Sequence, residues 1–165
     1  ISTQGVGGGA NIGEGKITVE PSKEVAKERV FCVIWHETIH ALFQERIDLL
    51  IKEYLRKNKF EKEIKDIGLG RNARNLINEV LVSSLIPEGY LAKKFFKKSI
   101  YKPDKVFQEK LKRDKNFGLI RAYLSWKLYS KTKHYIDNNK QLDRDYFKAI
   151  RKVYLDYLKK VSGRY

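Results

Sequence analysis

Two histidines and a glutamate lie close together in the segment His36-Glu37-Thr38-Ile39-His40, and their spacing suits metal chemistry. On an α-helix, side chains four residues apart lie one above the other, so His36 and His40 can both reach one Zn2+. Glu37, beside the first histidine, would then face a water molecule activated by the metal and take its proton. The chain holds only three histidines among 165 residues, so this arrangement is a specific signal. The alternative is a helix with two structural histidines and a surface glutamate.

The residues before the motif are apolar, and this favours a bound metal. Burying imidazole and carboxylate groups beside Phe31, Ile34 and Trp35 without a partner would be costly, and a metal ion would supply that partner. Cys32 lies one helical turn before His36. A buried apolar role is expected for its thiol, with thiolate ligation as the alternative.

A catalytic zinc site needs a third protein ligand, and Glu79 is the leading candidate. It interrupts an apolar run in which an unpaired carboxylate would be costly to bury or would stay protonated. Glu88 is the rival ligand, although an exposed turn residue between Pro87 and Gly89 is its expected role. His134 lies in a lysine-rich helical segment and is expected to be solvated.

Together these residues resemble the pattern of the gluzincin metallopeptidases, in which H-E-x-x-H is followed on a later helix by Asn-Glu. His36, Glu37 and His40 match the first part, and Asn78-Glu79 matches the second, with a spacing similar to that of the lethal-factor-like toxin peptidases. Pro87-Glu88-Gly89 is similar to the Glu-Gly element of another gluzincin-like group. The resemblance covers about half the chain. It implies a zinc-dependent endopeptidase with Glu37 as general base and a peptide or protein as substrate.

The resemblance also implies two supporting roles. A Tyr or His stabilises the tetrahedral oxyanion in gluzincins, and the candidates here are Tyr90, Tyr101 and His134. Many gluzincins place an acidic residue four positions after the third ligand, where it orients the first histidine. This chain has Ser83 there, so Asp48 or a backbone carbonyl would have to serve.

We expect a single domain over residues 1–165, of the α+β class and predominantly helical. The resemblance implies a zincin-like metallopeptidase fold with a small N-terminal β-sheet and a long active-site helix. The Gly-rich strand within residues 7–12 is expected to hold an extended peptide by β-addition. The predicted regions are Gly-rich strands at 1–20 with a turn at 13–15, the active-site helix region at 22–57, the third-ligand helix at 71–86, and a helical C-terminal part at 90–165.

Helical periodicity divides the C-terminal part into helices at 90–100, after Pro103, at 117–136 and at 143–161. Aromatic residues recur at helical spacing in the last two helices, which predicts core packing. The predicted core residues are Tyr123, Trp126 and Tyr129, followed by Tyr146, Phe147, Ile150, Tyr154 and Tyr157.

Charge and composition bound the remaining possibilities. The net charge of +15 comes with lysines spread along the chain, which favours a solvated basic surface over a dedicated binding stripe. No segment approaches the ~20 apolar residues of a membrane span, no signal peptide is recognisable, and one cysteine excludes an internal disulfide. The chain begins at Ile1 and contains no Met, which indicates a processed product or a fragment. Its compartment and oligomeric state stay open.

Two other functional classes are compatible with the sequence. One is a basic nucleic-acid-associated protein that keeps a peptidase-like fold and binds through its positive surface. The other is a non-catalytic module that a metal stabilises. Peptidase activity is the favoured interpretation, because Glu37 stands beside the first predicted ligand.

Overall fold

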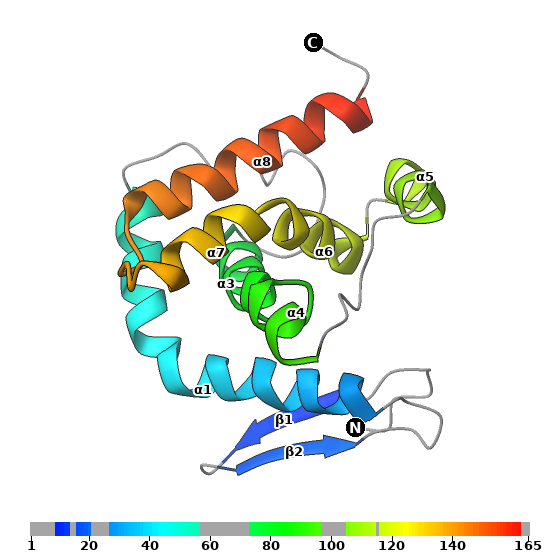
Figure 1. The fold of residues 1–165 in the computed structure, drawn as a ribbon. Coiled ribbons are helices and arrows are strands. Elements are labelled where there is room, and N and C mark those ends of the chain that lie inside the picture. The colour runs from blue at the N-terminus through cyan, green and yellow to red at the C-terminus, as the bar shows by residue number, and fades with distance from the viewer. Residues whose placement is uncertain are drawn as a thin grey trace.

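The computed structural model describes residues 9–13, 16–20, 27–56, 73–96, 105–114 and 116–162. Most of these residues are helical (Figure 1). The helices are α1 (Lys27–Arg56), α3 (Ala73–Leu85), α4 (Tyr90–Phe96), α5 (Lys105–Arg113), α6 (Phe117–Lys127), α7 (Tyr129–Asp137) and α8 (Arg144–Ser162). Two short strands, β1 (Gly9–Gly13) and β2 (Lys16–Glu20), precede them.

The expected α+β class, with a zincin-like fold built on an N-terminal β-sheet, is wrong. The fold is all-α, and no sheet forms a layer of its core. β1 and β2 pair antiparallel with each other, from Gly9 opposite Glu20 to Gly13 opposite Lys16, and with no other described segment. A ribbon of two five-residue strands cannot enclose a hydrophobic core, so the helical periodicity of the rest of the chain decides the fold class.

Helix α3 lies at the centre of the helical body. It contacts α1, α4, α6, α7 and α8, and it falls within the region predicted for the third-ligand helix. Leu76, Ile77 and Val80 are fully buried, as expected for a helix surrounded by others. A functional side chain on α3 is therefore held by packing from several directions.

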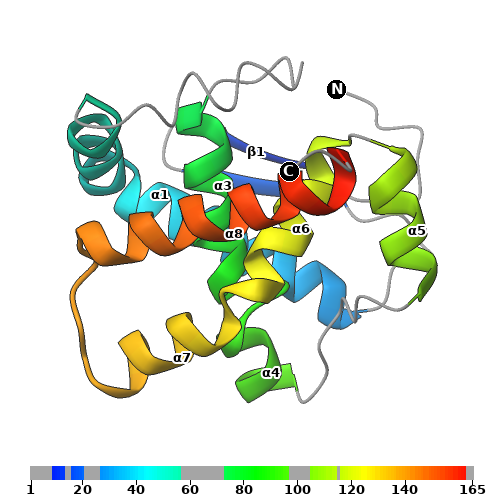
Figure 2. The ribbon, with the colours of Figure 1, turned by 90° about the horizontal axis from the view of Figure 1, so that it is seen from above.

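Helix α8 closes the body on one side. Figure 2 shows it crossing above α3 and α6, and its aromatic residues provide the contacts. Phe147 stacks on Tyr54 of α1 with ring centroids 5.2 Å apart, and Tyr157 lies against Tyr123 of α6 at 5.8 Å. The predicted core role is confirmed for Tyr123 and for the five α8 residues, all of which are buried: Tyr146, Phe147, Ile150, Tyr154 and Tyr157.

The other two aromatic residues of the predicted stripe are less buried. Trp126 of α6 is partly buried and packs against the core, as predicted. Tyr129 of α7 is half-buried, is not part of the core cluster, and packs edge-on against Tyr90 of α4. The predicted single helix at 117–136 is divided at Leu128, which lies between these two residues.

Leu128 joins α6 to α7 and hydrogen-bonds to both helices. Its backbone N–H donates to the Leu124 carbonyl at 3.0 Å, and its own carbonyl accepts from the Thr132 N–H at 2.8 Å. The Leu128 side chain is 1% exposed, so the joint itself lies in the core.

Helix α1 is the longest element, and it bends near its middle so that its second half turns toward α8 (Figure 1). The β1–β2 hairpin lies along its first half. In the described part of the chain, no helix has both the length and the apolar character required to cross a membrane.

Candidate metal centre

Helices α1 and α3 bring three of the predicted ligands together. The ligand atoms of His36, His40 and Glu79 all lie within 4.8 Å of one another. The two histidine Nε2 atoms are 3.1 Å apart, and they lie 3.5 and 3.6 Å from the two carboxylate oxygens of Glu79. Both histidines are buried, and Glu79 is partly buried. This is a compact set of two nitrogen donors and one carboxylate, which is the ligand type of several catalytic zinc sites.

A backbone carbonyl fixes the orientation of His36. The Nδ1 atom of His36 lies 3.0 Å from the carbonyl oxygen of Ile86, in the turn after α3. A carbonyl can only accept, so Nδ1 must carry the proton, and in the neutral ring Nε2 presents its lone pair to the cluster. This is the outer hydrogen bond that metal-binding histidines commonly make.

The hydrogen bond with Ile86 shows which of the two predicted groups, Asp48 or a backbone carbonyl, orients His36. The backbone carbonyl holds His36, whereas Asp48 forms an ion pair with Arg74. Ser83 is fully buried and contributes instead to the surroundings of Glu88. The supporting group is therefore a main-chain atom, which no side-chain pattern in the sequence could indicate.

Glu79 is held in its ionised form by its neighbours. Burial alone raises its pKa, but when the two imidazoles are protonated, the hydrogen bond from His36 and the charges of His36, His40 and Arg121 outweigh burial and lower the pKa to about 2. Arg121, on α6, places Nη1 3.5 Å from one Glu79 oxygen. A carboxylate that stays ionised is the form that can ligate a cation.

Glu88 is buried, so the expectation of an exposed turn residue is wrong. Its side chain is inaccessible to solvent, and one carboxylate oxygen lies 3.2 Å from Nη2 of Arg121. Burial raises the pKa of Glu88, and the charges of Arg121 and His36 oppose that rise. Glu88 therefore lies behind the cluster, connected to Glu79 through Arg121, and does not belong to the set of ligand atoms.

Arg121 is the site residue that the sequence analysis missed. Its guanidinium bridges the carboxylates of Glu79 and Glu88. A signal was present, because Arg121 is the only charged residue in the run Phe117–Trp126, just as Glu79 interrupts an apolar segment. A buried charge in an apolar run requires a partner, and two such charges on different helices can satisfy each other.

Glu37 lies beside the cluster and is partly buried. Burial raises its pKa, the charge of Glu79 raises it further, and the charges of His36 and Arg121 lower it, with a net upward shift. A general base needs a pKa above that of an ordinary carboxyl group, and the position of Glu37 provides this.

Tyr90 and His134 are not brought to the cluster. The Tyr90 hydroxyl donates to Asp137 of α7 at 2.8 Å. His134 is exposed on α7 and contacts Asn138. Tyr101 lies outside the described residues. Of the candidates for oxyanion stabilisation, the two that the structure describes are therefore away from the cluster.

Cys32 has the buried role expected for it. Its side chain is fully buried against Ile86 and Ala92, and it is not among the ligand atoms of the cluster. Burial, followed by the charges of Glu88 and Glu28, raises the pKa of the thiol to about 11. A protonated thiol is a poor metal ligand.

The turn after α3 has no room for a side chain at Gly89. A Cβ atom there would lie 1.6 Å from the backbone carbonyl oxygen of Ser84. Glycine thus lets the chain fold back closely on α3, and this close approach sets the positions of Ile86 and Glu88.

The chain matches no protein-family model, no curated protein and no solved structure. Its function must therefore be argued from the cluster and its surroundings.

Proposed function

We propose that this chain is a zinc-dependent peptidase, with His36, His40 and Glu79 as metal ligands and Glu37 as general base. The observation that carries the proposal is the convergence of the three ligand atoms within 4.8 Å from two helices. The motif helix supplies two of them and a buried helix the third, which is also the arrangement in gluzincins that the sequence resembles. The proposal rests on this site and not on a zincin-like fold.

The donor set fits Zn2+ better than it fits the harder cations. Imidazole nitrogen suits zinc and the late transition metals, whereas Mg2+ and Ca2+ prefer oxygen ligands. His36 already has the tautomer that metal binding requires, because its Nδ1 proton is engaged by Ile86. The 3.1 Å between the two Nε2 atoms brings their lone pairs toward a common point, which a cation between them and Glu79 would stabilise.

Bound Zn2+ would supply Lewis acidity, which acidifies a water molecule and polarises a peptide carbonyl. Glu37 would accept the proton of that water molecule at its carboxylate and later deliver it to the nitrogen of the leaving amine. Arg121 would keep the Glu79 carboxylate charged and oriented toward the two histidines.

The test compares two isosteric substitutions on α1. Glu37→Gln should retain zinc and the melting temperature but lose cleavage of a mixed peptide library by about 100-fold or more, because an amide cannot accept the proton. Glu45→Gln, at an exposed position on the same helix, is the matched control and should cleave at the parental rate. Zinc-loaded protein that leaves the library intact, or Glu37→Gln cleaving at the parental rate, would contradict the proposal.

Association with nucleic acid is a second candidate function, favoured by one group of residues on α4 and α7. The ammonium groups of Lys94 and Lys133 lie 5.7 and 5.4 Å from the centre of the Tyr90 ring, and that of Lys93 lies 5.5 Å from the centre of the Tyr129 ring. Lys133 is paired with Asp137, so the three cations and one carboxylate around these two rings leave a net positive surface, which suits phosphate groups. If this surface binds single-stranded DNA, Lys93→Gln should weaken affinity and flatten its dependence on salt, whereas Lys148→Gln on α8 should not.

A further inference from the structure

A hollow of about 490 Å³ lies beside the second half of α1, and the metal cluster does not explain it. Its walls come from α1, α3 and α7, and the turn before α8 completes it. None of the three candidate ligands and neither Glu37 nor Arg121 lines it. Its volume is typical of sites that bind small molecules.

The walls are mainly apolar, and one end is open to solvent. Ile39 and Leu81 are buried within them, while Phe43 at the edge is 47% exposed. Exposed aromatic surface beside an apolar hollow is costly to leave in contact with water, so an apolar ligand would gain free energy by covering it.

The polar groups in the floor already satisfy each other. The Tyr146 hydroxyl lies 2.6 Å from the Thr132 hydroxyl and 2.7 Å from that of Ser84, and the Thr132 and Ser84 hydroxyls each also lie within hydrogen-bonding distance of a backbone carbonyl. The floor therefore requires no polar partner from a ligand.

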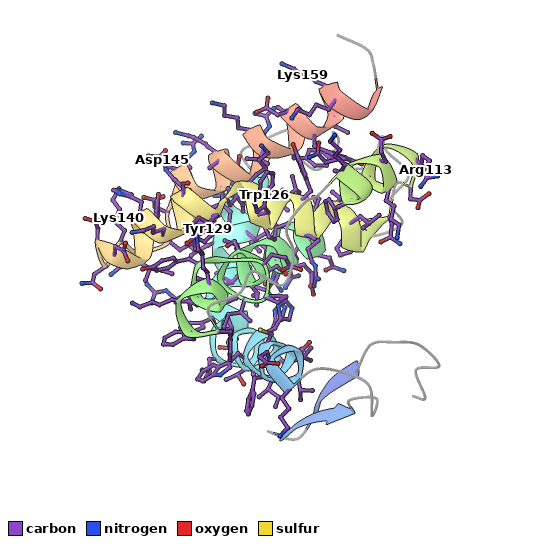
Figure 3. All side chains as sticks on the ribbon, turned by 45° about the vertical axis from the view of Figure 1, so that its right-hand side comes forward. Arg113, Trp126, Tyr129, Lys140, Asp145 and Lys159 are labelled. Atoms are coloured by element: carbon purple, nitrogen blue, oxygen red, sulfur yellow. The ribbon has the colours of Figure 1, made fainter. Side chains whose placement is uncertain are left out.

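Arg46 and Lys140 place two positive charges at one end of the hollow. Arg46 of α1 donates to the side-chain oxygen of Gln141 at 3.4 Å, and Lys140 is the next residue along that turn. Figure 3 shows Lys140 at the turn between α7 and α8. Among the described residues that line the hollow there is no Asp or Glu, so the charge at this end is positive. The Asp143 carboxylate, whose pKa the charge of Lys140 helps to lower, accepts hydrogen bonds from the Tyr135 hydroxyl and from the first turn of α8.

From these features we infer that the hollow binds a single-chain fatty acid. The alkyl chain lies between α1 and α3, and the carboxylate contacts Arg46 and Lys140. An apolar cavity with a cationic end discriminates against uncharged and cationic amphiphiles of the same length. This inference does not depend on the proposed peptidase activity.

Isothermal titration calorimetry of the full chain with dodecanoate, below its micelle concentration, tests the inference. We expect one saturable site, with dodecan-1-ol about tenfold weaker and dodecyltrimethylammonium weaker still, because only the carboxylate forms charge-assisted hydrogen bonds. From octanoate to dodecanoate, each added methylene should tighten binding about fourfold.

Two sets of variants locate the site. Arg46→Gln combined with Lys140→Gln should reduce dodecanoate affinity to that of the alcohol and leave the alcohol unchanged. Lys52→Gln combined with Lys148→Gln removes the same charge from exposed positions outside the hollow, and should leave dodecanoate affinity within about twofold. Leu85→Trp should fill the hollow and abolish binding of both dodecanoate and dodecan-1-ol. Circular dichroism checks that this variant folds. The inference would be overturned if the two double variants lost dodecanoate affinity equally, or if affinity for the alkanoates did not depend on their chain length.

Discussion

The imidazole of His36 donates to the main-chain carbonyl of Ile86 across 3.0 Å, and this bond connects the motif helix to the turn that ends α3. The acceptor is a backbone atom, so its position is set by the path of the turn and not by the type of side chain at residue 86. The orientation of the first candidate ligand thus depends on a close approach of two backbone segments at Gly89.

The first prediction concerns metal content. The purified chain supplied with zinc should hold about one ion, and His36→Ala or His40→Ala should weaken zinc binding by more than about 100-fold, because loss of an outer partner alone costs about 10–100-fold. His134→Ala, at an exposed position on α7, is the control and should bind normally. Stoichiometric zinc in His40→Ala, measured by elemental analysis, would refute the site.

The second prediction separates the two glutamates that Arg121 joins. Glu79→Gln should lower zinc affinity severely, whereas Glu88→Gln should change it only a few-fold, since the ligand atoms converge on Glu79 alone. Arg121→Gln should weaken zinc binding about tenfold by releasing the Glu79 carboxylate. Competition against a chelator of known affinity gives all three values. If Glu88→Gln lowers zinc affinity more than Glu79→Gln does, the third ligand is Glu88.

A third prediction tests the turn after α3. Gly89→Ala should lower the free energy of unfolding by about 3 kcal/mol, because the new Cβ meets a backbone carbonyl that cannot rotate away. Gly118→Ala is the matched control. Its Cβ would lie 3.2 Å from the movable side-chain oxygen of Asn116, so a change within about 1 kcal/mol is expected. Urea unfolding of both variants measures the difference, and equal stabilities would show that the turn can relax.

The fourth prediction concerns pH. Asp143 accepts from the backbone N–H groups of Asp145 and Tyr146 at 3.0 and 3.1 Å, and so caps the start of α8. The Tyr135 hydroxyl, bound at 2.6 Å, lowers the Asp143 pKa most strongly, and the two backbone bonds lower it further. A carboxyl whose folded pKa is lowered stabilises the fold above its unfolded pKa, about 3.9, and loses this contribution as pH falls through the folded pKa.

Substitution of the capping residue isolates that contribution. Asp143→Ala should cost about 1 kcal/mol at neutral pH, and the difference from the parent should shrink as pH falls below about 4. Asp143→Asn keeps a capping oxygen without the charge, so it should be less destabilised at neutral pH than the alanine variant. A difference that is constant down to pH 2 would show that the charge contributes nothing.

The site was largely predictable wherever a charged residue interrupts an apolar run. The four-residue spacing on a helix selected His36 and His40, and the rule of a charge in an apolar run selected Glu79; applied to α6, the second rule would also have selected Arg121. The rule of a charge in an apolar run failed at Glu88. The flanking residues Pro87 and Gly89 are turn formers, and the local sequence does not show that Arg121 of α6 contacts the turn. The Ile86 carbonyl could not be predicted, since every residue carries one.

The fold was predictable in its elements but not in its class. Helical periodicity located α3 and α8 closely, because each has a continuous apolar face. Alternation in residues 16–20 indicated a strand, and β2 is there, but strand pattern alone does not determine how many partners a strand finds. The division at Leu128 was also not predictable, because the sequence keeps a helical pattern on both sides of it.

Leu128 lies between the two helices that carry residues of the candidate metal centre and of the hollow. On one side of it α6 carries Arg121 to the ion cluster, and on the other side α7 carries Thr132 to the floor of the hollow. The joint is buried and hydrogen-bonds to both helices, so α6 and α7 meet at a packed residue with no loop between them. The candidate metal centre and the hollow therefore share one structural support, because close packing around Leu128 fixes the two helices that carry Arg121 and Thr132.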